Sequence, residues 1–140
     1  MLVRLLYASR PAAPLTSTVV DSILAQSRAH NPELGITGML CYSKDLFMQV
    51  LEGGRDEVCE LYNTIVRDDR HVNVRILCFE EIAERRFGSW TMGHVSVATI
   101  DPSLLLKYAT RPALNPFNGS GQASMALFDE LMATASVVGN

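Results

Sequence analysis

Cysteine is scarce in this chain, and the three cysteines form no recognisable pattern. Cys41, Cys59 and Cys78 are odd in number, widely spaced and set among apolar residues. A disulfide framework needs paired cysteines, and a structural zinc site needs closely spaced ligands. We therefore predict three free thiols that pack in the interior, with no metal bound to them.

The sequence also lacks long runs of a single character. Twelve lysine and arginine residues against fifteen aspartate and glutamate residues give a formal net charge of −3, without a dense basic run. This balance argues against a dedicated nucleic-acid binder. No apolar run approaches the roughly 20 residues of a membrane span, and residues 1–6 are too short for a signal peptide. We expect a cytoplasmic protein that contacts neither membrane nor nucleic acid.

Signatures of common enzymes are missing as well. His30, His71 and His94 match no metal-binding spacing, and Gly53-Gly54 lacks the lysine of a phosphate-binding loop. A nucleophile elbow is also absent. These absences predict that the chain is not an enzyme.

What is present is enough for one compact domain: 140 residues, of which 48% are hydrophobic. Alternating apolar residues predict strands at 2–9, 35–42, 47–52, 73–83 and 90–98, and helical spacing predicts helices at 18–30 and 58–66. Asn31-Pro32 should end the first helix, because the residue before proline avoids the helical region. The order β-α-β-β-α-β-β predicts an α+β, ferredoxin-like sheet with two helices on one face.

The remaining residues suggest a cover for the second face. A leucine segment at 104–106 and a loop rich in Pro, Asn and Gly at 111–121 precede a predicted helix near 122–137. A sheet with helices on one side needs an apolar layer on the other. We expect a domain of residues 1–98 and a helical extension of residues 99–140 packed on it, with an apolar stripe formed by Met125, Phe128, Leu131 and Met132.

Gln49 is the most informative single residue. It is an uncharged polar side chain within the apolar run Leu46 to Leu51, and on a strand it shares a face with Phe47 and Leu51. A buried amide without hydrogen-bond partners would cost about 1–3 kcal/mol. A glutamine satisfied by backbone groups is the ordinary explanation for one such residue.

Two further polar residues are expected near Gln49. In this topology the first strand lies beside the third, so Tyr7 and Gln49 can be neighbours on the face covered by the helices. Asn31 lies at the end of the first helix. A phenol and two amides could together frame a flat heterocycle with several hydrogen-bond acceptors.

At this point the sequence resembles the BLUF domains, flavin-binding receptors of blue light. The resemblance covers roughly the first 95 residues, and its motifs occur in the family's order and spacing. They are Leu6-Tyr7-Ala8-Ser9, Ala29-His30-Asn31, Gly35-Ile36-Thr37-Gly38, Phe47-Met48-Gln49-Val50-Leu51-Glu52-Gly53, Arg67-Asp68-Asp69-Arg70-His71 and Arg85-Arg86-Phe87-Gly88-Ser89-Trp90-Thr91-Met92. The length is similar to that of short members that carry only a helical extension.

The resemblance implies a flavin, usually FAD with FMN or riboflavin as alternatives, between the two helices. Asn31 would hold the polar edge of the ring, and Gln49 would bridge Tyr7 to the ring. Other matching positions would surround the ring and the ribityl-phosphate; they are His30, Asp68, Arg70 and His71, with apolar contacts from Ile23, Phe47 and Ile65. Trp90 and Met92 are two residues apart on the predicted last strand and are therefore expected to share a face, and the sequence does not decide which of them faces the flavin.

The resemblance also implies a mechanism. Light would drive electron and proton transfer from Tyr7 and rearrange the hydrogen bonds of Gln49, and the signal would pass to a separate, unidentified partner protein. A homodimer through an exposed part of the apolar stripe is a further option. Two other functions remain open: a protein-interaction module without a cofactor, and a small flavin-dependent redox enzyme.

Overall fold

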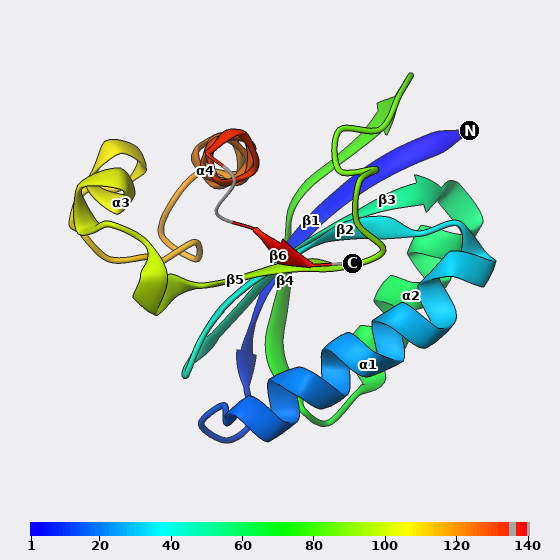
Figure 1. Cartoon of the computed structure of the whole chain (residues 1–140), viewed down its shortest axis with the longest axis horizontal. Coiled ribbons are helices and arrows are strands. Elements are labelled where there is room, and N and C mark those ends of the chain that lie inside the picture. The colour runs from blue at the N-terminus through cyan, green and yellow to red at the C-terminus, as the bar shows by residue number, and fades with distance from the viewer. Residues whose placement is uncertain (135–136, 140) are drawn as a thin grey trace.

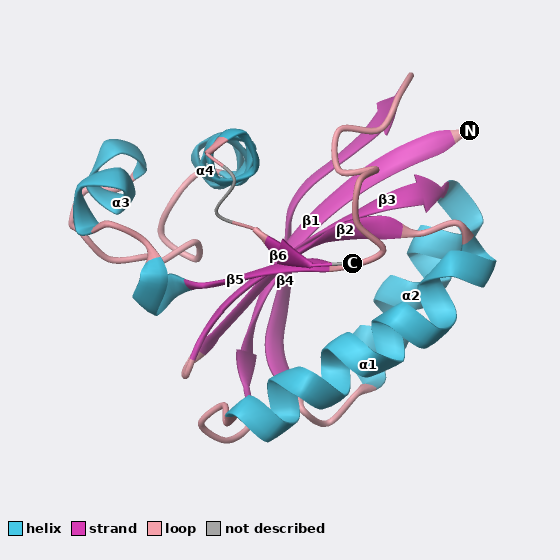
Figure 2. Cartoon of the chain, in the orientation of Figure 1, coloured by secondary structure: helices cyan, strands magenta, loops and turns pink. Residues whose placement is uncertain are grey.

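The computed structural model describes residues 1–134 and 137–139. Five strands and two long helices in the order β-α-β-β-α-β-β make up the first 96 residues, and further helices follow (Figures 1 and 2). The elements are β1 (Leu2–Pro11), α1 (Ser17–Leu34), β2 (Thr37–Ser43), β3 (Leu46–Gly54), α2 (Arg55–Arg67), β4 (His71–Ile82), β5 (Gly93–Ser96), the short 3-10 helix η1 (Val97–Thr99), α3 (Pro102–Tyr108), α4 (Gly121–Ala133) and β6 (Val138–Gly139).

The strands form one mixed sheet in the order β4-β1-β3-β2-β5-β6. β1 lies between β3 and β4 and is antiparallel to both, whereas β5 runs parallel to β2. β2 and β3 form an antiparallel hairpin around the turn at Lys44-Asp45. The predicted ferredoxin-like α+β fold is therefore confirmed, with β6 as an additional strand.

Each face of the sheet has its own hydrophobic core. Helices α1 and α2 cover one face, and α3 and α4 lie on the other side (Figure 1). Tyr7, Phe47 and Leu51 are buried with Val20 and Val58 under the first pair of helices. The second core is built around the other side chains of the same strands and the apolar stripe of α4; its members include Leu6, Met48, Val50, Phe87, Phe128 and Leu131. The predicted stripe is thus part of the core.

The first helix is longer than predicted. It continues through Pro32 to Leu34 and ends at Gly35, which has φ 68° and donates its N–H to the carbonyls of Asn31 and Pro32. A proline in the last turn removes a single helical hydrogen bond, and a glycine in the left-handed region satisfies the final carbonyls. The prediction that Asn31-Pro32 ends the helix was wrong for this reason.

The predicted last strand was too long. Only residues 93–96 of the predicted 90–98 are strand, and Trp90 and Met92 lie in the preceding segment. Because that backbone is not extended in a ladder, the two side chains do not share a face. Met92 packs beside Tyr7 under α1 and α2, and Trp90 packs with the opposite core. The expectation of a common face was wrong.

The helix predicted near 122–137 is α4, which ends at Ala133. Residues 135 and 136 of that prediction lie outside the described residues, and 138–139 form β6. Within residues 1–134 and 137–139, no helix is long and apolar enough to cross a membrane. The same residues contain no group of three histidine, cysteine or carboxylate side chains arranged to hold a metal ion.

The three cysteines are free thiols. Cys41 is fully buried, and burial raises the pKa of its thiol to about 12. Cys59 and Cys78 are half-buried, so packing in the interior holds fully for Cys41 alone.

Candidate functional site

A cavity of about 280 Å³ lies between the sheet and helices α1 and α2. The strands supply its floor and the two helices its walls. All ten residues predicted to contact a cofactor line it, which brings together side chains up to 64 positions apart in the chain, namely Tyr7, Ile23, His30, Asn31, Phe47, Gln49, Ile65, Asp68, Arg70 and His71.

Five more residues line the cavity that the sequence analysis did not name. Gln26 and Ser27 belong to α1, Leu61 and Thr64 to α2, and Leu40 to β2. The four residues on helices could have been found from the sequence, because positions three or four residues apart on a helix share a face. Ile23 therefore predicts Gln26 and Ser27, Ile65 predicts Leu61, and Thr64 follows from its position three residues after Leu61.

Tyr7 and Gln49 are directly opposite each other in the β1–β3 ladder. The Tyr7 hydroxyl donates to Gln49 Oε1 over 2.5 Å, and the two side chains are 1% and 5% exposed. Burial is the main cause that raises the pKa of Tyr7 above its ordinary value. The phenol is therefore protonated at every physiological pH and donates to the amide oxygen.

The other end of the Gln49 side chain contacts Met92. Gln49 Nε2 donates to Met92 Sδ over 3.2 Å, and Met92 is fully buried. Sulfur is a weak acceptor, so this end of the amide is held less firmly than the oxygen. The sequence left open whether Trp90 or Met92 lies near Gln49, and this structure places Met92 there.

Asn31 connects the cavity to the segment that carries Met92. Its side chain is 2% exposed, and Nδ2 donates to the Thr91 carbonyl over 3.2 Å. Its own backbone carbonyl accepts the N–H of Ile36, which directly precedes β2. No hydrogen bond from another described residue reaches the Asn31 amide oxygen, which can therefore accept one from a group in the cavity.

Charged residues form part of the cavity wall after α2. The Arg70 guanidinium donates to both carboxylate oxygens of Asp68 over 2.7–3.1 Å and to Gln26 Oε1 over 3.0 Å. The hydrogen bond from Arg70 is the main cause that lowers the pKa of Asp68. The pair holds the Arg70 cation beside the cavity.

His71 closes the cavity beside Phe47. The two rings are 4.6 Å apart, and His71 Nδ1 lies 2.8 Å from the Ser9 hydroxyl. Burial is the main cause that lowers the pKa of His71 below 6.5, outweighing the attraction of Asp68. The ring is therefore neutral at pH 7.

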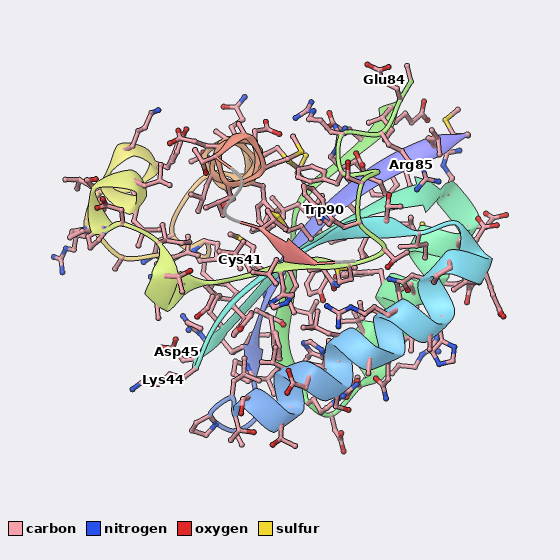
Figure 3. All side chains as sticks on the ribbon, viewed as in Figure 1. Cys41, Lys44, Asp45, Glu84, Arg85 and Trp90 are labelled. Atoms are coloured by element: carbon pink, nitrogen blue, oxygen red, sulfur yellow. The ribbon has the colours of Figure 1, made fainter. Side chains whose placement is uncertain are left out.

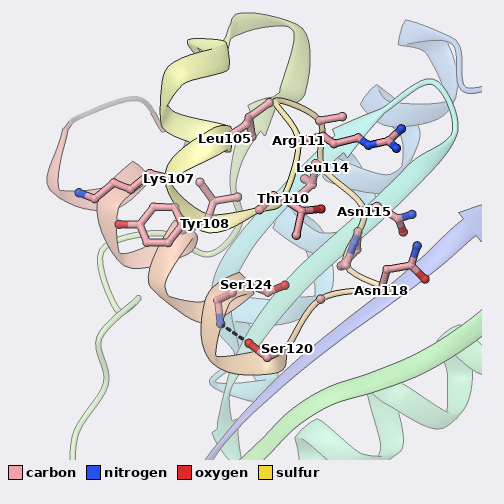
Figure 4. Close-up of a pocket in the computed structure, with 16 residues that line it drawn as sticks. Leu105, Lys107, Tyr108, Thr110, Arg111, Leu114, Asn115, Asn118, Ser120 and Ser124 are labelled. Carbon is pink, nitrogen blue, oxygen red and sulfur yellow. Dashed lines mark hydrogen bonds between the residues drawn. The ribbon is translucent and has the colours of Figure 1, made fainter.

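A second cavity of about 850 Å³ lies between α3, the following loop and α4 (Figure 4). Its lining includes Leu105, Thr110, Leu114 and Ser124, and it shares no lining residue with the first cavity. None of the predicted site residues lies there.

The comparison with protein families decides the identity of the fold. A model of the BLUF family, described as sensors of blue-light using FAD, matches residues 2–93. The chain belongs to the BLUF family. It is a blue-light sensor domain that uses a flavin, and the Tyr7–Gln49 hydrogen bond lies in its cavity.

Curated relatives carry the BLUF sequence within much longer proteins. The photoactivated adenylate cyclase subunit beta of Euglena longa is 35% identical over 92 residues, which are 65% of this chain and 11% of that protein. The blue light- and temperature-regulated antirepressor BluF of Escherichia coli (strain K12) is 30% identical over 88 residues, 63% of this chain and 22% of that protein. The chain thus spans a small part of these relatives.

Solved BLUF structures include chains of the same extent. BlsA in its photo-activated state is 31% identical with a TM-score of 0.82, and 94% of this chain and 95% of that chain are covered. BlrB, a BLUF protein in the dark state, is 35% identical with a TM-score of 0.75, and 96% of both chains is covered. These matches agree with the prediction of a sensor rather than an enzyme.

The residues of the BLUF cavity fit a flavin ring. The Asn31 and Gln49 amides provide donors and acceptors for its polar edge, and Ile23, Phe47 and Ile65 provide apolar contacts. A volume of about 280 Å³ is at the small end of ligand pockets, which span about 300–1,000 Å³. The ring system can enter such a cavity, whereas a dinucleotide tail has to extend beyond it. The role of each residue in binding stays a prediction.

The stability of this BLUF domain is expected to fall in mild acid partly through His71. Below about pH 6.5 the His71 imidazole takes up a proton in the unfolded chain, whereas in the folded protein it stays neutral down to a lower pH. The free energy of unfolding therefore decreases as the pH falls from about 6.5 through the lowered pKa of the folded state. Above that pH the ring is neutral in both states. In urea unfolding at pH 7.5 and 5.5, His71→Asn should lose less stability between the two pH values than the unchanged protein does.

The matched control is the exposed His30. His30→Asn should keep the full loss of stability between the two pH values. An equal loss in His71→Asn and the unchanged protein would contradict the assignment to His71.

Proposed function

We propose that this BLUF domain senses blue light through FAD, that Tyr7 is the electron and proton donor, and that Gln49 carries the persistent change. The observation that supports this most strongly is the continuous hydrogen-bonded chain from Tyr7 through Gln49 to Met92 beside the cavity. It joins the redox-active phenol of Tyr7 to the Gln49 amide, which can turn over, and to Met92, which directly precedes β5.

Tyr7 is prepared for coupled transfer. A bound flavin supplies absorption of blue light and an excited state that accepts an electron. Loss of an electron makes a phenol O–H strongly acidic, and the Tyr7 proton already points along a 2.5 Å hydrogen bond at Gln49 Oε1. The burial of Tyr7 keeps bulk water away from this proton.

Gln49 is suited to store the result. Its two ends have nearly the same shape and opposite hydrogen-bond polarity, so rotation or a tautomer change exchanges donor for acceptor at almost constant volume. After rotation the amide oxygen would face Met92 Sδ, which has no proton to donate. The Gln49–Met92 contact would then be lost, and Met92 would be released.

The release of Met92 can reach the rest of the domain. Met92 directly precedes β5, which pairs with β2 and with β6 near the end of the chain. A change of about 1–3 kcal/mol in hydrogen bonding is enough to bias a two-state element. We propose that the signal leaves through this region to a separate partner protein in the cytoplasm.

The choice of FAD rests on the family description and on the position of Arg70. A cation beside the cavity suits the phosphates of a flavin tail. A similar structure, Klebsiella pneumoniae BlrP1 with FMN and cyclic diGMP, is 26% identical with a TM-score of 0.71, and the match covers 96% of this chain and 35% of that chain. Chromatography of the flavin released from the purified protein separates FAD, FMN and riboflavin.

Absorption spectroscopy tests the proposed function. The protein purified after expression with FAD should be yellow, should shift reversibly to the red under blue light, and should return in darkness. Bleaching would instead indicate reduction of the flavin and favour a redox enzyme. A folded but colourless protein would favour an interaction module without a cofactor.

A further inference from the structure

The segment between β4 and β5 crosses from one face of the sheet to the other. Residues 83–92, all within the described part of the chain, form neither helix nor strand. Phe87 and Trp90 pack with the core under α3 and α4, whereas Met92 packs beside Tyr7 on the cavity side. Figure 3 labels Arg85 and Trp90 along this segment. Without a backbone ladder, its path depends on contacts made by its neighbours.

Glu52 makes the densest set of these contacts. Its carboxylate is fully buried and accepts the N–H of Phe87 over 2.6 Å and the N–H of Arg86 over 3.0 Å. It also accepts Arg4 Nε over 2.7 Å, and Arg4 is 3% exposed. Hydrogen bonds to an ionised acceptor are stronger than neutral ones, and a buried charge persists only when it is fully paired.

Arg85 strengthens the same attachment. Its guanidinium donates to Thr37 Oγ1 over 2.8 Å, to the Gly35 carbonyl over 2.7 Å and to the Glu52 carbonyl over 3.1 Å. The start of the segment is thereby fixed to the ends of β2 and β3. Further along, Gly38 N–H donates to the Trp90 carbonyl over 3.2 Å.

β3 therefore holds both ends of the crossing segment. Glu52 fixes residues 86 and 87 on one face, and Gln49, three residues earlier in the strand, contacts Met92 on the other. The part of β3 between Gln49 and Glu52 fixes the distance between these two attachments, and residues 86–92 have to span it. Gly38 and Asn31 also hold the carbonyls of residues 90 and 91, so we expect a change at the Glu52 end to reach Met92 through residues 88–91 and to alter how closely Met92 approaches the amide.

We infer that Glu52 is a positioning residue of the photoswitch, which fixes residues 86–87 and thereby holds Met92 Sδ against the Gln49 amide. The inference rests on the proposed function of Gln49. Return of the amide to its dark orientation requires Met92, which is released in the lit state, to move again while the amide turns past it. A segment that is less firmly attached makes room more readily, so the lit state should decay faster.

Glu52→Gln in the flavin-bound full chain tests this. The substituted amide keeps the shape but has one acceptor oxygen for three donors. Losing one or two net hydrogen bonds should speed dark recovery about two- to tenfold. In methyl NMR of methionine-labelled protein, the signal of the buried Met92 should also shift in the dark.

Glu80→Gln is the matched control. Glu80 also binds Arg4, over 2.7 Å, but is 45% exposed and lies on β4. This variant should recover at the unchanged rate. An equal acceleration in both variants would mean that the effect comes from the Arg4 charge, and would overturn the inference.

Arg85→Gln gives a second way to loosen the segment if Glu52→Gln does not fold, and it should also speed recovery and shift Met92. Normal recovery with an unchanged Met92 signal in the folded variant would overturn the inference. If the unchanged protein does not photoconvert, the proposed function fails by itself, and the Met92 signal still decides whether Glu52 positions that side chain.

Discussion

Replacement of Gln49 by leucine is expected to leave a protein that binds flavin but shows no reversible red shift. Leucine fills a similar volume and keeps the apolar contacts of the cavity, but it has no polar end to reverse. The Tyr7 hydroxyl loses its acceptor, which should cost about 1–3 kcal/mol of folding stability. Bound flavin is measured by its absorption, and the shift by light-minus-dark difference spectra.

Gln26→Leu is the matched control for this experiment. It removes another glutamine amide that lines the cavity, one that binds Arg70 instead of Tyr7. The control should keep the red shift at its normal size. A normal shift in Gln49→Leu would exclude the amide as the switch, and a lost shift in both variants would mean that any change in the cavity abolishes it.

Replacement of Tyr7 by phenylalanine is the second change with a large expected effect. The ring that packs under α1 and α2 is kept, but the hydroxyl that donates to Gln49 is removed. Phenylalanine is a far poorer electron donor and has no proton to give. We expect photoconversion to be abolished and the fluorescence lifetime of the bound flavin to increase, because the quenching transfer is lost.

Tyr62→Phe provides the comparison for Tyr7→Phe. Tyr62 lies on helix α2, and its ring is 6.0 Å from the Tyr7 ring. The Tyr62 hydroxyl takes no part in the hydrogen bonds of Gln49. This variant should photoconvert with a short fluorescence lifetime. If Tyr7→Phe photoconverts normally, Tyr7 is not the donor. If Tyr62→Phe alone fails to photoconvert, the donor is Tyr62.

The central part of the site could be predicted because it depends on regular structure. The period of two in β1 and β3 places Tyr7 and Gln49 on one face, and the split β-α-β topology makes those strands neighbours. Their hydrogen bond follows from the register. Asn31 was expected from its place at the end of the first helix, whereas Ile23 was expected only from the resemblance to the family.

The surroundings of Met92 could not be predicted, because they depend on contacts between distant residues. The alternating pattern around residue 90 suggested a strand, but the segment follows the hydrogen bonds of Glu52, Arg85 and Asn31 instead. Such contacts have no period in the sequence. The same holds for Pro32, whose effect on α1 is offset by the cap at Gly35 three residues later.

Trp90 and Met92 pack on opposite faces of the sheet, which bears on how a signal can leave the cavity. Met92 contacts the amide, and Trp90 packs on the side of the C-terminal helices. The two side chains therefore lie at opposite ends of a crossing, and a displacement of Met92 can reach the second core through the backbone between them.

Infrared difference spectroscopy of protein labelled with ¹³C and ¹⁵N in its glutamine side chains tests the central claim most directly, because it observes the amide itself. The account predicts light-minus-dark bands that move with the label, that persist in Gln26→Leu and that disappear in Gln49→Leu. A red shift accompanied by a difference spectrum that does not respond to the glutamine label would contradict the claim that the Gln49 amide carries the light-induced change.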